Sequence, residues 1–308
     1  MILITGAAGF IGSKVAHKFI ELGFETITID NLSTGRKENI PKETHLIEGS
    51  CGDKSIIDKL NSYKIDGIIH LAGQSSGEVS FDNPAYDLES NTLSTILLLD
   101  FARRKGIKRF VFASTMSVYG DQVNLPVTEE LTTNPKSFYA CGKLASENYL
   151  KIYAHLGIES TALRLFNIYG PGQNLDNLKQ GMLSIYLAQA INDNKILVKG
   201  SKDRFRDFVY IDDVVNAFVL VFCKTWKKYN AYNICTGNPT TVNDLLLGIQ
   251  NNLGKEVNIL FKEGTLGDQF GIYGNYDKIN KDYAWRPNIS MSEGLFLMVE
   301  WAKSQQYD

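Results

Sequence analysis

The chain has 308 residues, 44% of them hydrophobic and 21% charged, and its formal net charge is −2. This composition is typical of a folded globular protein, and the length suits one large domain with a smaller lobe. Because there is no basic excess, we expect no nucleic-acid binding, and because no run of about 18 apolar residues occurs, we expect no membrane-spanning helix. The four cysteines form no CxxC pair, so we expect free thiols in a reducing cytoplasm and no metal site.

Short apolar runs alternate with helical patterns through the first half of the chain. The predicted strands are nearly continuous in apolar residues and lie at 1–5, 25–30, 45–49, 66–72, 108–114 and 160–165. The predicted helices lie between them, at 10–22, 53–62, 84–106 and 135–156. This alternation predicts an α/β fold, a doubly wound parallel sheet of the Rossmann type. Since a strand begins at the first residue, we expect no signal peptide before it.

The alternation loosens after residue 170. A strand–helix unit at 208–222 and a helix at 241–253 are still recognisable. We therefore predict a first domain over 1–170, with segments near 198–234 returning to it, and a smaller lobe formed mainly by 171–308. Since ligands of open α/β sheets bind at the carboxyl ends of the strands, the smaller lobe is expected to bind the substrate.

A glycine-rich turn, TGAAGFIG (5–12), follows the first strand directly and opens the first helix. Its three glycines are Gly6, Gly9 and Gly12. They allow, in that order, a tight turn, close approach of the backbone to a pyrophosphate, and close packing of the helix on the strand. The amide groups of the helix start, including those of Phe10 and Ile11, face the anion. The pattern predicts a dinucleotide site in the first domain.

Acidic residues after the next two strands indicate which dinucleotide binds. Asp30 ends the second strand, where a carboxylate accepts hydrogen bonds from ribose hydroxyls and repels the extra phosphate of NADP, so we favour NAD. The alternative is that Asp30 only starts the following turn, together with Asn31. Asp53 opens a short helix, and an N-cap role and an adenine contact remain equally open.

A tyrosine and a lysine lie four residues apart in YACGK (139–143), which places both on one face of a helix. A phenol has an ordinary pKa near 10, and we expect a neighbouring ammonium and a charged nicotinamide to lower it towards neutrality. Tyr139 can then act as a general base towards an alcohol, with Lys143 as its activator. Thr115, at the end of the fifth strand, can donate a hydrogen bond to the same substrate oxygen.

Seven segments together resemble the extended short-chain dehydrogenase/reductases, especially the nucleotide-sugar 4-epimerases. They are TGAAGFIG, DNLSTG (30–35), HLAG (70–73), STMSVYG (114–120), YACGK, FNIYGPGQ (166–173) and RDFVYIDDV (206–214). The resemblance implies NAD as cofactor, Tyr139 as the base, Lys143 as its activator and a ribose ligand, and Thr115 as the third catalytic residue. The further cofactor contacts that we assign are Leu71, Ala72, Gly73 and Ser114.

The substrate implied by the resemblance is a nucleotide-diphosphate sugar, with a UDP-sugar favoured. The residues that we assign to it are Ser75, Ser117, Asn167, Arg206 and Asp268. Arg206 is expected on the diphosphate, because a guanidinium binds phosphate oxygens in pairs. Its alternative role is an ion pair with Asp207 or Asp203. Ser75 lies in a polar stretch that either contacts sugar hydroxyls or is a solvated loop.

The residues after Thr115 bear on which reaction is catalysed. The family's 4,6-dehydratases have an Asp-Glu pair there, and its sugar-acid decarboxylases have a nearby glutamate. This chain has Met116 and Ser117, which do no general acid or base work at neutral pH. We therefore expect epimerisation at C4 through a transient 4-keto intermediate. The alternatives are an oxidoreductase, dehydratase or different-carbon epimerase on this fold, and a non-catalytic NAD-binding regulator.

The chain departs from the family pattern in its C-terminal lobe. Thr265 stands where an arginine usually binds the diphosphate, and Lys262 or Lys202 is the candidate replacement. Ile272 stands where related epimerases limit the size of the sugar, and it leaves room for an N-acetylated one. The helices predicted at 84–106 and 135–156 have apolar residues on more than one face, and by resemblance we expect them to pair in a homodimer.

Overall fold

The computed structural model describes residues 1–224, 228–264 and 269–305. The chain forms two compact units, each assembled from segments far apart in sequence. Unit 1 consists of Met1–Val118, Pro135–Arg164 and Val215–Tyr232. Unit 2 consists of Tyr119–Asn134, Leu165–Val214 and Asn233–Asp308.

Unit 1 is built on a seven-stranded sheet of order β10-β6-β5-β4-β1-β2-β3. Its strands are β1 (Ile2–Thr5), β2 (Thr26–Asp30), β3 (His45–Glu48), β4 (Gly67–His70), β5 (Arg109–Thr115), β6 (Glu159–Leu165) and β10 (Tyr229–Ile234). The pairs β1–β2, β1–β4, β2–β3 and β4–β5 are parallel. The order reverses between β1 and β4, which is the point where doubly wound sheets bind their ligand. The predicted Rossmann-type α/β fold is confirmed.

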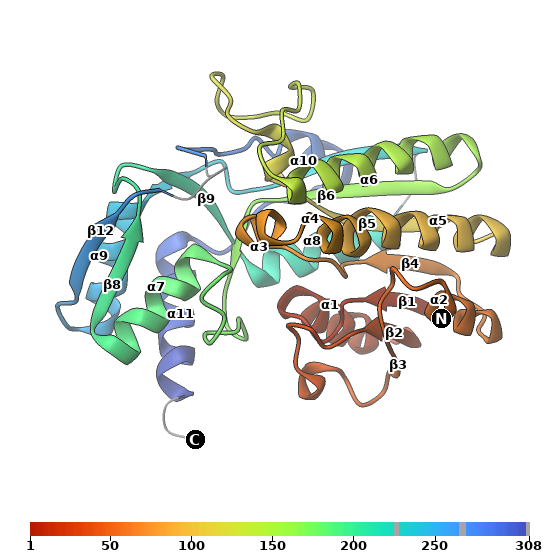
Figure 1. Cartoon of the computed structure of the whole chain (residues 1–308), viewed down its shortest axis with the longest axis horizontal. Coiled ribbons are helices and arrows are strands. Elements are labelled where there is room, and N and C mark those ends of the chain that lie inside the picture. The colour runs from red at the N-terminus through yellow and green to blue at the C-terminus, as the bar shows by residue number, and fades with distance from the viewer. Residues whose placement is uncertain (225–227, 265–268, 306–308) are drawn as a thin grey trace. The chain divides into compact units, whose positions relative to one another are not determined.

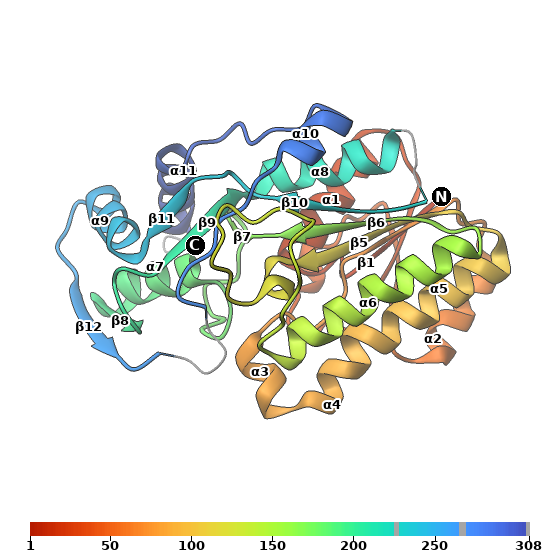
Figure 2. The ribbon, with the colours of Figure 1, turned by 90° about the horizontal axis from the view of Figure 1, so that it is seen from above.

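Helices cover both faces of this sheet. They are α1 (Phe10–Glu21), α2 (Lys54–Asp58), α3 (Gly77–Asp82), α4 (Pro84–Asp87), α5 (Ser94–Lys105), α6 (Phe138–His155) and α8 (Ile211–Cys223). In Figure 2, α5 and α6 lie along one face, and α1 and α8 along the other. The rings of Phe19 on α1 and Phe222 on α8 are 5.2 Å apart, edge to face. Because apolar side chains meet helices on both faces, the strands are nearly continuous in apolar residues.

Unit 2 contains two small sheets. One has the order β11-β9-β7 and the other pairs β12 with β8. Their strands are β7 (Asn167–Tyr169), β8 (Lys195–Lys199), β9 (Phe205–Tyr210), β11 (Pro239–Thr241) and β12 (Asn258–Lys262). The helices are α7 (Met182–Asp193), α9 (Val242–Leu253), α10 (Asp277–Tyr283) and α11 (Met291–Ser304). Figure 1 shows α7 and α9 beside β8 and β12.

The structure differs from the sequence prediction in three places. The predicted helix 84–106 is interrupted by π-helical turns at 88–93, where a wider turn replaces the α-helical one. The polar stretch after β4 forms the short helix α3, capped by the Ser76 hydroxyl. Residues 229–234 join the main sheet as predicted. The strands within 195–210 pair in the small sheets instead. We did not predict this pairing, because the partner strands lie in segments with no strong strand pattern.

Two further features concern the whole described chain. The thiols of Cys51, Cys141, Cys223 and Cys235 are all free. Over the described ranges, no helix has both the length and the apolar character that crossing a membrane requires.

Candidate active site

The glycine-rich turn joins β1 to α1 with almost no space left for side chains. Gly6 has a φ of +76°, and a Cβ there would lie 2.7 Å from the backbone nitrogen of Ala72. A Cβ on Gly12 would overlap the carbonyl of Gly6. The first and third glycines therefore have the roles predicted for them, the tight turn and the close packing of helix on strand.

The start of α1 is free of side chains that would compete with an anion. Its N-cap is Gly9, and among the described residues no side chain caps it and no acidic residue occupies its first turn. By contrast, α6 is capped by Ser137, whose hydroxyl accepts from the amide of Ala140 at 3.2 Å. An uncapped helix start after a glycine turn suits a pyrophosphate, which the helix dipole also favours.

Asp30 is fixed above this turn. Its Oδ2 accepts from the amide of Ala8 at 2.9 Å, and its Oδ1 accepts from the amide of Leu32 at 2.8 Å. Each oxygen retains a lone pair, so the carboxylate can also accept from ribose hydroxyls. Asn31 is exposed, and its Oδ1 accepts from the amide of Ser33. Both readings of Asp30 therefore hold together: it starts the turn and remains suited to a ribose.

Asp53 is the N-cap of α2. Its Oδ1 accepts from the amide of Ser55 at 2.8 Å, and these hydrogen bonds lower the pKa of its carboxyl. The N-cap role is thus observed, and the adenine contact remains a prediction.

The loop after β4 is tied to the glycine turn through Thr5. The amides of Leu71 and Ala72 donate to Thr5 Oγ1 at 3.2 and 3.1 Å, and this oxygen lies 2.8 Å from His70 Nδ1. Burial lowers the pKa of His70 to about 3, so the imidazole is neutral. The predicted cofactor contacts on this loop are therefore held against the turn, whereas Ser75 is exposed.

The three predicted catalytic residues come together in unit 1. The Thr115 side chain lies close enough to the Tyr139 phenol to lower its pKa. The Lys143 ammonium lies 6.0 Å from the centre of the Tyr139 ring and donates to the carbonyl of Ala113 at 3.1 Å. Thr115 ends β5, and the tyrosine and lysine share one face of α6, as the four-residue spacing predicted.

Burial controls the ionisation of this group. It raises the pKa of Tyr139 to about 12 and lowers that of Lys143 to about 8. In the chain without cofactor the pKa of the tyrosine therefore shifts upward, whereas the lowering that we predict counts on the ammonium together with a charged nicotinamide and stays a prediction. The physical reason is that removing water destabilises the phenolate, and this outweighs the hydrogen bond from Thr115, which lowers the pKa.

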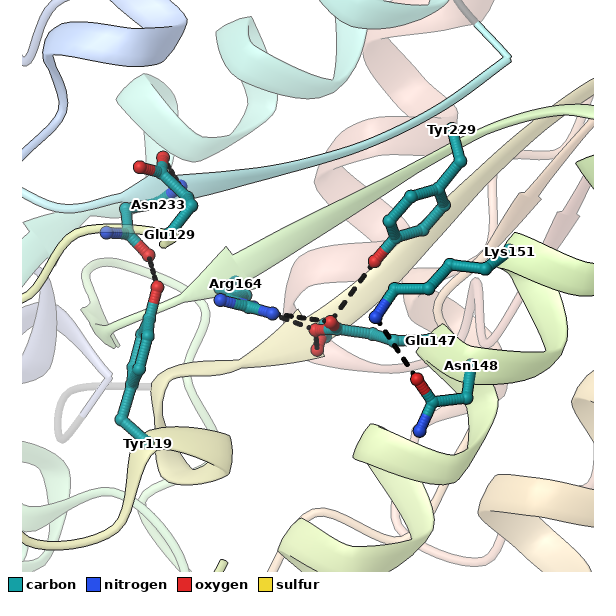
Figure 3. A network of polar contacts seen from close by, with 9 residues as sticks. Tyr119, Glu129, Glu147, Asn148, Lys151, Arg164, Tyr229 and Asn233 are labelled. Atoms are coloured by element: carbon teal, nitrogen blue, oxygen red, sulfur yellow. Dashed lines mark hydrogen bonds and ion pairs between the residues drawn. The ribbon is translucent and has the colours of Figure 1, made fainter. Parts of the chain in front are cut away.

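Ser114 contributes its side chain to a buried network. Its hydroxyl donates to Glu147 Oε1 at 2.5 Å, and Arg164 donates to both oxygens of Glu147, at 3.0 and 2.7 Å. Figure 3 shows Arg164 and Tyr229 converging on this carboxylate. The predicted cofactor contact of Ser114 stays a prediction, open to its backbone and to its hydroxyl as an acceptor.

A simple register links β5 to α6. Ala113 accepts from Lys143, Ser114 donates to Glu147, and the next strand residue, Thr115, lies beside Tyr139. These helix residues are spaced by four, so they lie on one face. Sequence reasoning missed Glu147, although the same four-residue spacing that revealed the other two was the signal.

Ser117 lies against the catalytic threonine. Its amide donates to Thr115 Oγ1 at 3.2 Å, and the Thr115 hydroxyl donates to Ser117 Oγ at 3.2 Å. Met116 begins the same 3₁₀ turn and is half-buried. Thus neither side chain after the threonine offers a carboxylate.

Unit 2 holds the predicted substrate residues Asn167 and Arg206. Asn167 lies on β7, and its Oδ1 is buried without a hydrogen-bond partner among the described residues. Arg206 lies on β9, is 3% exposed, and donates to the carbonyls of Phe205, Gln269 and Phe270. Its diphosphate role stays a prediction.

The hydrogen bonds of Asp207 and Asp203 do not support the alternative ion pair with Arg206. Asp207 accepts from Thr236 and Gly237, and Asp203 is bonded within its own turn to Ser201. Asp268 and Thr265 lie outside the described residues, and Ile272 is fully buried.

Comparison with known proteins gives a consistent match over the chain. A family model described as the NAD dependent epimerase/dehydratase family matches residues 2–235. The crystal structure of the UDP-glucose 4-epimerase of Thermotoga maritima with UDP-glucose matches with a TM-score of 0.95 and 34% identity, over 99% of each chain. That of Thermus thermophilus in complex with NAD matches with a TM-score of 0.91 and 30% identity, over 98% of each. The UDP-glucose 4-epimerase of Mycolicibacterium smegmatis is 30% identical, covering 98% of each chain.

Proposed function

Because the chain belongs to the NAD-dependent epimerase/dehydratase family, we propose that it epimerises C4 of a nucleotide-diphosphate sugar through a transient 4-keto sugar. Its cofactor is NAD. The observation that carries the proposal is the meeting of Thr115, Tyr139 and Lys143 in unit 1, where a buried hydroxyl, a half-buried phenol and a buried ammonium lie together.

The cofactor contacts that we propose follow the turn and the loops around it. Gly6, Gly9, Gly12 and the amides of Phe10 and Ile11 hold the pyrophosphate, and Asp30 and Asn31 take the adenosine ribose. The remaining proposed cofactor contacts are Asp53, the loop residues Leu71 to Gly73, and Ser114. The fit rests on the uncapped start of α1 and on the lone pairs that Asp30 retains.

The reaction divides between the side chains as follows. Tyr139 takes the proton of the sugar 4-hydroxyl, and Thr115 donates a hydrogen bond to the same oxygen. When bound, oxidised nicotinamide would supply the hydride acceptor and a positive charge that favours the phenolate. Since the phenol is protonated in the free chain, Lys143 alone does not make it a base. After the keto sugar has turned its other face, the hydride returns to C4 and Tyr139 returns the proton to the oxygen, so that C4 is inverted and the oxidised cofactor is regenerated.

Epimerisation is favoured over elimination by what surrounds the threonine. A dehydratase has to move additional protons to expel water, and Met116 and Ser117 offer no acid for that step. Asn167, Arg206, Ser75, Ser117 and Asp268 are our candidate ligands of the sugar nucleotide. A UDP-sugar is favoured because the similar proteins named above are UDP-glucose 4-epimerases.

We also propose a cytoplasmic homodimer. The paired helices α5 and α6 and the turns before them expose large apolar side chains. These are Leu88, Leu93, Phe138, Tyr149, Ile152 and Leu156. A second copy of the chain packing on these helices would remove them from water.

The proposal is tested with UDP-glucose, UDP-galactose and a panel of dTDP-, GDP- and CDP-sugars, using mass spectrometry and proton NMR. We expect products of unchanged mass whose ring couplings show an inverted C4. Loss of water would show a dehydratase, and stoichiometric build-up of reduced cofactor would show a dehydrogenase. Tyr139→Phe is expected to abolish turnover and leave NAD binding intact, and activity in this variant would refute the assignment of the base.

A further inference from the structure

A buried carboxylate that we did not predict lies beside the catalytic group. Asp87 ends α4 and is 1% exposed. Its Oδ1 accepts from Gln74 Nε2 at 2.8 Å and from Asn91 Nδ2 at 3.1 Å. Both donors are neutral amides, so they satisfy the oxygen without balancing its charge. A buried carboxylate of this kind is stabilised by a nearby cation.

Lys143 is the cation that the fold places near it. The lysine is 4% exposed, and its ammonium donates to a neutral backbone carbonyl. The helix α4 packs against α6, and a Cβ on Gly142, the residue before the lysine, would lie 3.3 Å from Asp87 Oδ2. A Cβ on Gly73 would lie 3.2 Å from Lys143 Nζ and would also touch Asn91 Oδ1. The amide of Asn91 therefore borders both the carboxylate and the ammonium.

We propose that Asp87 is the counter-ion that keeps Lys143 protonated in the active site. It is a positioning residue, since it acts on the reaction through the lysine. The inference deepens the proposed function and rests on it for its catalytic meaning, whereas the charge coupling itself is a property of the folded chain.

The charges around the lysine support this assignment. Burial lowers the pKa of Lys143 to about 8, and Asp87 is the described carboxylate whose charge opposes that fall. The same charge raises the pKa of Tyr139 on α6. His70 on β4 is neutral because burial and the Lys143 charge lower its pKa to about 3, and the buried Glu147, on the same face of α6 as the lysine, is paired with Arg164. Without Asp87, the ammonium would therefore lose its proton at lower pH.

The direct test is an NMR titration of Lys143 in the full-length protein labelled with ¹³C at the lysine Cε, with the signal assigned by its loss in Lys143→Met. We expect Asp87→Asn to lower the titration midpoint by about one pH unit or more. Asp100→Asn is the matched control, since it removes an exposed carboxylate from α5, and it is expected to leave the midpoint unchanged. An unchanged midpoint in Asp87→Asn overturns the proposal.

A reciprocal measurement covers the case in which Asp87→Asn does not fold. A pairwise charge coupling acts equally on both partners, so Lys143→Met is expected to raise the midpoint of the Asp87 carboxyl. No rise in that variant would also overturn the proposal.

The catalytic consequence is read from the pH dependence of kcat/KM. In Asp87→Asn we expect the high-pH limb of the kcat/KM profile to move to lower pH. The decrease in kcat/KM relative to the unchanged protein then grows with pH, and it reaches about tenfold for each pH unit by which the limb has moved. A loss of equal size at every pH would indicate a merely structural role and count against the proposal. Because the NMR titration needs no turnover, a coupled Lys143 in a protein that epimerises no nucleotide sugar would refute the proposed function and leave the coupling intact.

Discussion

The buried Glu147–Arg164 pair gives the sharpest stability prediction. The carboxylate is fully buried and the guanidinium is 5% exposed, and two hydrogen bonds of 3.0 and 2.7 Å join them. In Glu147→Gln, Arg164 keeps its buried charge but loses the carboxylate charge that balances it. Removing one member of such a pair costs about 3–5 kcal/mol. That is a large part of the about 5–15 kcal/mol by which proteins of this kind are stable.

The assay is equilibrium unfolding in urea, followed by circular dichroism and by tryptophan fluorescence. Thermal unfolding should show a decrease in Tm of roughly 6–20 °C, at about 2–4 °C per kcal/mol. The control is Glu21→Gln, because the Lys18–Glu21 pair has side chains that are 47% and 64% exposed and such surface pairs contribute about 0–1 kcal/mol.

A double variant separates the charge from the packing. Glu147→Gln with Arg164→Met removes both charges and fills a similar volume, so most of the lost stability is expected to return. Two results would refute the reasoning from an uncompensated buried charge. One is a loss of unfolding free energy below about 1 kcal/mol in Glu147→Gln. The other is a double variant that is no more stable than Glu147→Gln alone.

Three further predictions concern the cofactor site and pH. Gly12→Ala forces α1 away from the Gly6 carbonyl. We therefore expect the affinity for NAD, measured by isothermal titration calorimetry, to fall by at least about tenfold. An unchanged affinity would contradict the packing role of Gly12. Asp30→Ala is expected to lower the affinity for NAD about tenfold and to reduce the preference for NAD over NADP. An unchanged ratio of the NAD and NADP affinities would exclude the ribose contact. His70 has a folded pKa of about 3, below its unfolded value near 6.5, so its contribution is full above pH 6.5 and decreases as the pH falls. We expect about 2 kcal/mol of unfolding free energy to be lost between pH 7 and pH 5, and His70→Asn to lack that part of the decrease.

Local patterns predicted much of unit 1. The six strands are recognisable from apolar runs because parallel strands covered on both faces tolerate little else. The glycine turn is encoded within eight residues, since its steric demands act between neighbours in sequence. The pairing of Tyr139 with Lys143 was predictable for the same reason, because a four-residue spacing on one helix places both side chains on one face. In unit 2 the strands are short, and their partners lie in segments without an alternating pattern, so most of them were not predicted.

The sequence by itself determined the Rossmann-type sheet, the dinucleotide turn and the pairing of tyrosine with lysine, because each depends on contacts within a few residues. Only the tertiary structure decided that Asp87 lies beside Lys143 and that Arg164 meets Glu147. It also decided that burial raises the pKa of Tyr139 in the chain without cofactor. The physical reason is that desolvation and charge coupling depend on which elements pack together, and no local pattern carries that information.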